Sequence, residues 1–108
     1  MKKLLVRYKV KSNKVDENET LVKEVYKQLN EKKIDGFHYC TFKLADGLSF
    51  VHIAFSETDE ANTAFSNLPA FKNFQANIKD RCDELPVAGP VSIIGAYDFQ
   101  VTEFNFSR

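Results

Sequence analysis

The sequence contains no tryptophan, one methionine, two cysteines, two histidines, three prolines and four glycines. Two cysteines and two histidines at these positions match no zinc-binding pattern, and both thiols are expected to be free. The scattered glycines form no phosphate-binding loop. No apolar run approaches the roughly 20 residues that a membrane-spanning helix needs. No linker rich in Pro, Gly or Ser divides the chain, so residues 1–108 are expected to form one domain.

The charges are balanced, with 15 basic and 15 acidic residues and a formal net charge of zero. This balance argues against a strongly basic nucleic-acid-binding protein. The first six residues resemble the start of a signal peptide, but Arg7, Lys9 and Lys11 end the apolar stretch too early. A cytoplasmic location is therefore expected. Apolar residues make up 44% of the chain, as in an ordinary globular domain.

The first part of the chain reads as a strand followed by a helix. Residues 4–10 alternate between apolar and polar side chains, which is the period of a strand. Asp16 and Glu19 have the spacing of a capping box and predict a helix over 17–33. Its apolar stripe consists of Leu21, Val22, Val25, Tyr26 and Leu29. Gly36 is expected to end this helix.

A hairpin is predicted next. Residues 37–44 and 48–55 are rich in aromatic and β-branched side chains, and Asp46-Gly47 between them is a preferred two-residue turn. This turn pairs Thr41 with His52, and two residue sets then share the two faces of the sheet. The face with Cys40, Phe42, Leu44, Val51, Ile53 and Phe55 is the predicted core. The face with Phe37, Tyr39, Thr41, Lys43, Phe50, His52 and Ala54 is predicted to be open.

The second half predicts two helices and one strand. A short helix through Ala61, Ala64 and Phe65 follows the polar segment 56–60. Pro69 suits the first turn of another helix, whose stripe is Phe71, Phe74, Ile78, Cys82 and Leu85. Residues 86–90 are predicted to be a loop and 91–101 the last strand. Residues 102–108 form a tail in which Phe104 and Phe106 suggest either an extra segment docked on a partner subunit or a frayed terminus.

The order strand, helix, strand, strand, helix, strand predicts an α+β protein of the ferredoxin-like type, βαββαβ. Its four antiparallel strands carry both helices on one face. The opposite face would keep Leu5, Phe37, Tyr39, Phe50 and Ile94. Because a semi-apolar open face usually has a partner, we expect a homodimer in which two sheets close an α+β barrel.

The chain resembles the antibiotic biosynthesis monooxygenase family of dimeric α+β barrels, from about Leu4 to Phe99. The resemblance lies in segment 55–61, with Phe55, an acidic turn and Ala61, and in segment 67–71 with Phe74. It implies the barrel fold, a homodimer and oxygenase activity on aromatic polyketides without a cofactor. The chain departs from the family by having Phe55 where Trp is frequent. The haem-degrading branch requires a histidine that residues 69–85 lack.

The polar residues of the predicted open face are the candidate site. A cofactor-independent oxygenase must ionise its substrate, and His52 is the natural base because its ordinary pKa is about 6.5. Arg7 and Tyr39 are predicted to steady the resulting anion. Thr41, Phe50, Phe37 and Asp98 are predicted to bind the substrate, a small aromatic or polyphenolic molecule in the dimer cavity. No metal, cofactor, nucleic acid or membrane is expected.

Other interpretations of the same residues stay open. His52 paired with Thr41 also fits a structural hydrogen-bonded histidine, and Arg7 with Asp98 also fits an interior ion pair. The protein would then be a non-catalytic or stress-related dimer whose cavity holds a small apolar ligand or nothing.

Overall fold

The computed structural model describes residues 1–99 of the 108 and has the predicted α+β architecture. Its strands are β1 (Lys2–Val10), β2 (Phe37–Lys43), β3 (Ser49–Ser56) and β4 (Cys82–Pro90). Its helices are α1 (Val15–Lys32), α2 (Asp59–Ser66), α3 (Pro69–Ala76) and the single turn α4 (Ile78–Arg81), and a 3₁₀ turn, η1, spans Ser12–Lys14. All neighbouring strands are antiparallel, in the order β2-β3-β1-β4. This is the ferredoxin-like arrangement.

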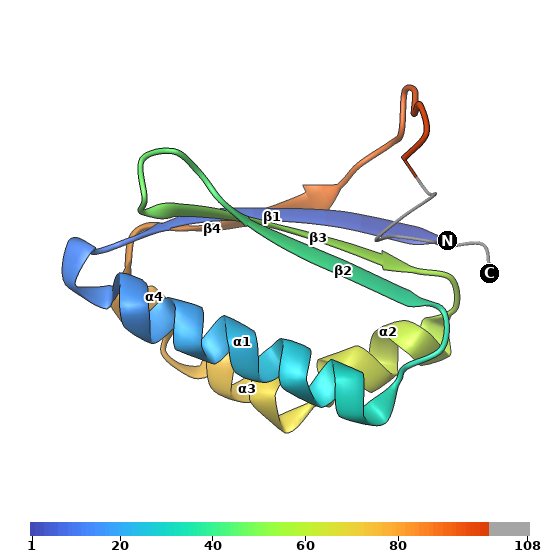
Figure 1. The fold of residues 1–108 in the computed structure, drawn as a ribbon, viewed down its shortest axis with the longest axis horizontal. Coiled ribbons are helices and arrows are strands. Elements are labelled where there is room, and N and C mark those ends of the chain that lie inside the picture. Colours follow the sequence, from blue (N-terminus) through green and yellow to red (C-terminus); the bar gives the residue numbers. More distant parts are fainter. Residues whose placement is uncertain (100–108) are drawn as a thin grey trace.

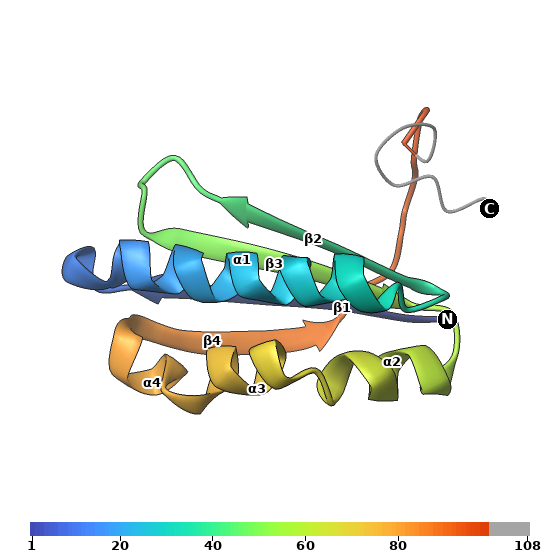
Figure 2. The same ribbon diagram turned by 60° about the horizontal axis from the view of Figure 1, so that its bottom comes forward.

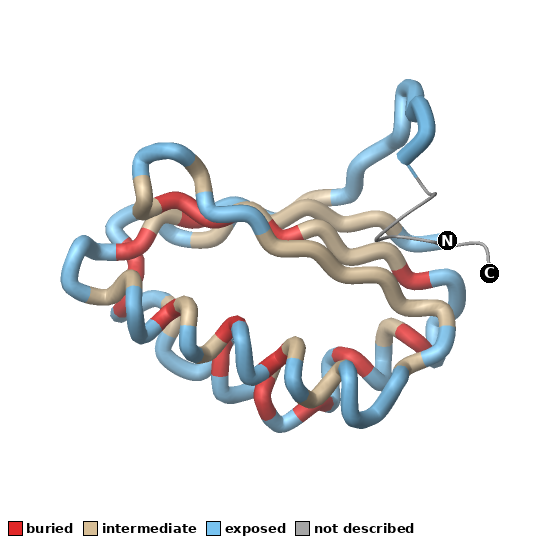
Figure 3. The backbone as a smooth tube through the Cα atoms, viewed as in Figure 1, coloured by how far each residue is buried: buried red, intermediate tan, exposed pale blue. Residues whose placement is uncertain are grey.

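The helices form one layer under one face of the sheet (Figures 1 and 2). Helix α1 runs beside α2 and α3, and buried residues gather on the helix sides that point at the sheet (Figure 3). The stripe predicted for α1 is confirmed, since Val22 and Val25 are buried in the core. The core is completed by Phe65 of α2 and Phe74 of α3. The opposite face of the sheet carries no helix among residues 1–99.

The ends of α1 differ from the predicted ones. The helix begins at Val15, and Lys14 at its N-cap offers no side-chain hydrogen bond, so Asp16 and Glu19 form no capping box. Asp16 instead lies in the first turn, where its charge is favourable. At the other end, Lys33 takes the left-handed conformation that was assigned to Gly36. Gly36 also has a positive φ, of 76°, in the turn that leads into β2.

The register of the predicted hairpin is confirmed, with Thr41 opposite His52 and Cys40 opposite Ile53. Its turn is larger than predicted. Regular pairing ends at Lys43 and Phe50, and the amide of Gly47 donates to the carbonyl of Leu44 at 3.0 Å. Gly47 alone takes a positive φ in this turn. The Asp46 carboxylate accepts the Ser49 hydroxyl at 2.6 Å and the amides of Leu48 and Ser49 at 2.9 and 2.8 Å, and these hydrogen bonds hold its pKa down at about 2.

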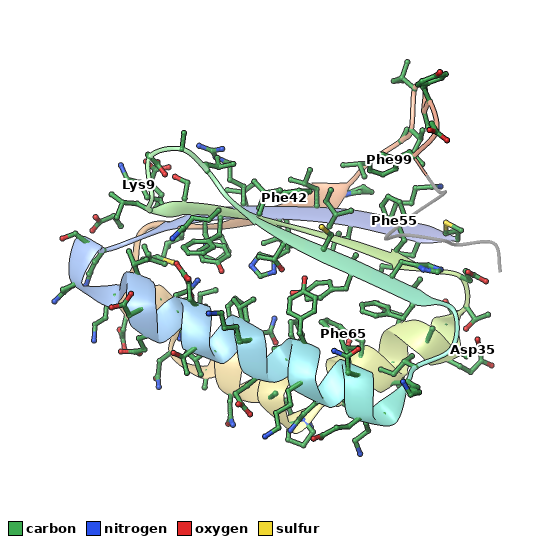
Figure 4. The ribbon with its side chains drawn as sticks, viewed as in Figure 1. Lys9, Asp35, Phe42, Phe55, Phe65 and Phe99 are labelled. Carbon is green, nitrogen blue, oxygen red and sulfur yellow. The ribbon has the colours of Figure 1, made fainter. Side chains whose placement is uncertain are left out.

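The helices cover the face that was predicted to be open. Phe37 stacks on Phe65 of α2 with ring centroids 4.3 Å apart, and Tyr39 lies 4.8 Å from the same ring. Figure 4 shows Phe65 under the sheet and Phe42 and Phe55 on its other side. The sets of residues that share a face were therefore correct, and the assignment of the faces was wrong. Both sets are apolar enough to be a core, so composition could not separate them.

The last strand lies earlier in the chain than predicted. Strand β4 covers Cys82–Pro90, which includes the predicted loop 86–90 and the end of the predicted long helix. Prolines are tolerated here because β4 is an edge strand that pairs with β1 alone. Between Glu84 and Val87, β4 has one residue more than β1, which makes a bulge around Leu85 and Pro86.

Residues 91–99, predicted to be a strand, have no regular structure and rise on the sheet side away from the helices (Figure 1). Ile93, Ile94 and Tyr97 in this segment are exposed. The predicted tail 102–108 lies outside the described residues. Across residues 1–99, every helix is too short or too polar to cross a membrane.

Candidate functional site

A pocket of about 480 Å³ lies between the sheet and the α3–α4 segment. Its inner wall is formed by sheet residues, among them Tyr8, Tyr39 and His52, and by the rings of Phe65, Phe71 and Phe74. Its outer part includes Gln75, Lys79, Leu85 and Pro86. The volume falls in the range of small-molecule sites, and mostly apolar walls with a few polar groups are typical of such sites. This pocket is enclosed by one chain, whereas the predicted cavity was shared by two.

His52 is the polar centre of the pocket. Its Nδ1 lies 2.6 Å from the hydroxyl of Tyr39 and 3.1 Å from that of Thr41, and its Nε2 lies 2.8 Å from the hydroxyl of Tyr8. All three partners come from the sheet, because Val6 and Thr41 are the register partners of His52 and place β1 and β2 on either side. Both ring nitrogens are thus hydrogen-bonded, and the ring is packed 5.4 Å from that of Phe74.

Burial changes the acid–base character of His52. The side chain is 4% exposed, and this desolvation lowers the pKa of His52 to about 4. The imidazole is therefore neutral at pH 7. A neutral imidazole donates one hydrogen bond and accepts another, so the direction of the hydrogen bond to one tyrosine sets the direction of the bond to the other.

The tyrosines around His52 keep their protons. Burial raises the pKa of Tyr8 and of Tyr39 well above the usual value, and it raises the pKa of Tyr26 to about 12. Tyr26 of α1 lies 2.7 Å from the Thr41 hydroxyl and stacks on Tyr39. Each phenol thus has one hydrogen to donate at neutral pH, and Tyr39 and Tyr8 both line the pocket.

Two further buried groups extend this network behind the pocket. The amide nitrogen of Asn18 donates to the Tyr8 hydroxyl at 2.9 Å, and the Nε of Arg81 donates to Asn18 Oδ1 at 3.1 Å. Asn18 comes from the first half of α1, and Arg81 is the last residue of α4. A hydrogen-bonded chain of Arg81, Asn18, Tyr8, His52 and Tyr39 therefore runs through the core.

The structure brings together some of the predicted site residues and separates others. Tyr39 and Thr41 contact His52, whereas Phe50 stacks on Tyr8 and Phe37 stacks on Tyr39 at the back of the site. Arg7 was predicted to share the face of His52, but it pairs with Val51 and is exposed on the opposite face. Asp98 is exposed in segment 91–99, away from the pocket. Neither charged group lines this pocket.

Sequence reasoning missed Tyr8, Asn18 and Arg81. Tyr8 carried a signal, because a tyrosine in the apolar set of a strand usually needs a buried partner for its hydroxyl. Asn18 and Arg81 carried little signal, since polar residues near helix ends are ordinarily solvated. Within residues 1–99, no three His, Cys, Asp or Glu side chains are grouped so that they could hold a metal ion.

Comparisons with known proteins find likeness in structure and none in sequence. No protein-family model matches the chain, and no curated protein matches it.

Several solved structures share the fold. A structure described as an antibiotic biosynthesis monooxygenase superposes with a TM-score of 0.72 and 14% identity, over 88% of this chain and all (100%) of the other. Rv0793 from Mycobacterium tuberculosis superposes with a TM-score of 0.71 and 14% identity, over 87% of this chain and 95% of the other. A variant of SnoaB, a cofactor-independent oxygenase from Streptomyces nogalater, superposes with a TM-score of 0.65 and 16% identity, over 87% of this chain and 93% of the other. The resemblance stated from the sequence is thereby confirmed at the level of the fold.

Proposed function

We propose that this chain is a cofactor-independent monooxygenase that oxidises a small aromatic or polyphenolic substrate in the pocket between its sheet and its helices. The observation that carries the proposal is the Tyr39–His52 pair, whose hydrogen bond of 2.6 Å lies in the wall of an apolar pocket of about 480 Å³. Rings of Phe65, Phe71 and Phe74 suit a flat aromatic guest. The shared fold with a cofactor-independent oxygenase supports the same activity.

The reaction begins when the substrate gives its acidic proton to solvent water at the outer part of the pocket, because the resulting phenolate or enolate is electron-rich enough to reduce O₂. The reacting carbon is a CH₂ group of the substrate. Both of its C–H bonds break, and a C=O bond forms in their place. One oxygen atom of O₂ enters that carbonyl group, and the other leaves as water when the O–O bond breaks. The substrate supplies all the electrons that O₂ takes up, so the chemistry needs no flavin or metal.

We assign the site residues roles that differ from those expected from the sequence. With a pKa of about 4, His52 is a weaker base than the sequence suggested. We assign the direct contact to Tyr39, whose hydroxyl donates a hydrogen bond to the substrate oxygen as negative charge develops there. His52 holds and polarises Tyr39, and Thr41 holds His52. Phe50 and Phe37 support Tyr8 and Tyr39 from behind. Arg7 and Asp98 have no role in this pocket.

The face of the sheet without helices is the proposed homodimer interface. Leu5, Val51, Ile53 and Phe55 are half-buried there, and Phe42 and Val87 are 44% and 73% exposed. The apolar segment 91–99 rises on the same side (Figure 1). A flat apolar sheet face is well covered by another sheet, and the second copy of this chain provides one.

A second function is favoured by the weak basicity of His52. An apolar pocket with a fully hydrogen-bonded, neutral histidine can also bind an aromatic ligand without reacting with it. In that case the protein is a non-catalytic ligand-binding dimer.

The test is oxygen consumption by the purified protein with a panel of quinols and anthrones. His52→Gln is expected to reduce turnover on the order of 100-fold, because Tyr39 then loses the group that holds it, and His38→Gln, which changes the other histidine, is expected to leave turnover unchanged. His38 is a fair control because it contacts Glu57 outside the pocket. Binding of these compounds without oxygen consumption would support the non-catalytic function. Equal turnover in wild type and His52→Gln would overturn the proposed site.

A further inference from the structure

Arg81 is a buried cation without an acidic partner among residues 1–99. It is 1% exposed, and its guanidinium lies 5.2 Å from the centre of the Phe74 ring. Its Nη2 donates to the carbonyl of Phe74 at 2.7 Å, and its Nε donates to Asn18 Oδ1 at 3.1 Å. Burying a guanidinium is costly.

The chemistry of arginine fixes the direction of every hydrogen bond that follows. A guanidinium can only donate, so Asn18 must turn its oxygen toward Arg81 and its NH₂ group toward Tyr8. The Tyr8 oxygen therefore accepts from Asn18 Nδ2 at 2.9 Å. The single hydrogen of Tyr8 is then free for its other neighbour, Nε2 of His52 at 2.8 Å.

The same direction continues through His52. Because Tyr8 donates to Nε2, that nitrogen must carry the lone pair, and the hydrogen of the neutral imidazole must be on Nδ1. Nδ1–H then donates to the oxygen of Tyr39 at 2.6 Å, with Thr41 as a more distant acceptor at 3.1 Å. The hydrogen of Tyr39 is left for the Thr41 hydroxyl, which also hydrogen-bonds Tyr39, or for a ligand in the pocket beside it.

We propose that Arg81 and Asn18 are positioning residues that set the tautomer of His52 and so make the Tyr39 hydroxyl a hydrogen-bond donor toward the pocket. Neither residue is part of the pocket lining. If the chain of bonds ran the other way, Tyr39 would donate to Nδ1 and could only accept from a ligand. The direction set by Arg81 therefore selects ligands with a carbonyl or anionic oxygen at this point. This choice of ligand rests on the proposed function, whereas the tautomer does not.

The tautomer can be read in the free protein by NMR of ¹⁵N-labelled histidine at about pH 8, where His52 is neutral. The Cδ2 hydrogen shows a two-bond coupling to Nε2, which distinguishes the two ring nitrogens. The signals that disappear in His52→Gln belong to His52. The expected result for the wild type is hydrogen on Nδ1 and a lone pair on Nε2. Hydrogen on Nε2 would overturn the proposal.

Asn18→Asp is the sharpest variant because it replaces the donating NH₂ group by an accepting oxygen and keeps the size of the side chain, so it reverses the direction of the hydrogen bonds. The new carboxylate can only accept, so Tyr8 is expected to donate to it and to accept from Nε2–H of His52. The hydrogen of His52 should therefore move from Nδ1 to Nε2. Asn30→Asp on the exposed part of the same helix adds the same charge and should leave His52 unchanged.

The outcomes separate this inference from the proposed function. An Asn18→Asp protein that keeps hydrogen on Nδ1 overturns the inference. If Asn18→Asp does not fold, the His52 tautomer measured by NMR in the wild type tests the inference without the variant. Turnover in Asn18→Asp is expected to fall on the order of 100-fold, as when one donor to the reacting oxygen is lost. A reversed tautomer with full turnover would support the positioning role and contradict the function proposed for Tyr39.

Discussion

Tyr39 and His52 lie on the neighbouring strands β2 and β3, and the Tyr39 hydroxyl is 2.6 Å from Nδ1 of His52. They are joined diagonally across the sheet, since the register partner of His52 is Thr41. Aromatic side chains from α1 and α2 hold Tyr39 in place, with Tyr26 and Phe65 at ring distances of 5.2 and 4.8 Å. The pair is therefore rigid before any ligand enters, as a preorganised donor should be.

Tyr39→Phe removes the donor and keeps the ring. We expect kcat for a quinol or anthrone to fall by about 100-fold, with a smaller change in KM, because the lost bond strengthens as the oxygen becomes anionic. Steady-state oxygen consumption measures both constants. Tyr26→Phe is the matched control, since it also removes a hydroxyl near Thr41 but does not line this pocket. Equal losses in the two variants would contradict a direct role for Tyr39.

The buried His52 should make stability depend on pH. Its pKa is lowered from 6.5 in the unfolded chain to about 4 in the folded one. Between these values the unfolded state binds more protons, so the stabilisation is complete above pH 6.5 and is lost as the pH falls toward 4. The loss should total about 3 kcal/mol. Urea unfolding across this range measures it, and a slope as steep in His52→Gln would assign the effect to other groups.

Gly47→Ala should destabilise the hairpin. Gly47 has a φ of 73°, and a methyl group there meets no atom within 4 Å, so the backbone conformation alone carries the cost. We expect a loss of about 1 kcal/mol in the free energy of unfolding. Gly95→Ala is the control, because it also has open space but no left-handed backbone. Chemical denaturation measures the free energy of unfolding of both variants. Identical values would contradict a cost from the left-handed backbone at position 47.

Ile53→Lys should dissociate the proposed dimer. Ile53 lies on the central strand β3 and belongs to the face without helices. A lysine there would be buried without a partner, which should raise the dissociation constant on the order of 100-fold or more. Native mass spectrometry and sedimentation measure the assembly. Thr63→Lys, at an exposed site on α2, supplies the same charge as a control. An unchanged dimer in Ile53→Lys would place the interface elsewhere.

The sequence was sufficient to predict the order of most elements and the hairpin register. Alternation fixes which side chains share a face, so Tyr39, Thr41 and His52 were correctly grouped. It does not say which face the helices cover, because the two faces are similarly apolar. Arg7 was misplaced for a related reason. The register between β1 and β3 comes from tertiary packing, and it sets Val6, not Arg7, opposite His52.

Strand β4 was mispredicted because the helical spacing of the residues before Pro86 and the proline itself both favoured a helix followed by a loop. Cys82 and Leu85 continue the helical spacing of Phe74 and Ile78, and Pro86 is typical of a loop. The helix nevertheless ends at Ala76, apart from one further turn, and an edge strand with a bulge accommodates the proline. The chain of bonds behind the pocket was beyond prediction, since Asn18 and Arg81 are 63 residues apart.

The pocket belongs to one chain, and this has a genetic consequence. Among residues 1–99, the side chains that hydrogen-bond His52 come from the same polypeptide, so a subunit joined to a defective partner is expected to keep its own proposed site. Mixed dimers of wild-type and His52→Gln subunits should retain half of the specific activity. An inactive allele would therefore be recessive, and two inactive alleles altered at different positions of the pocket would not complement each other.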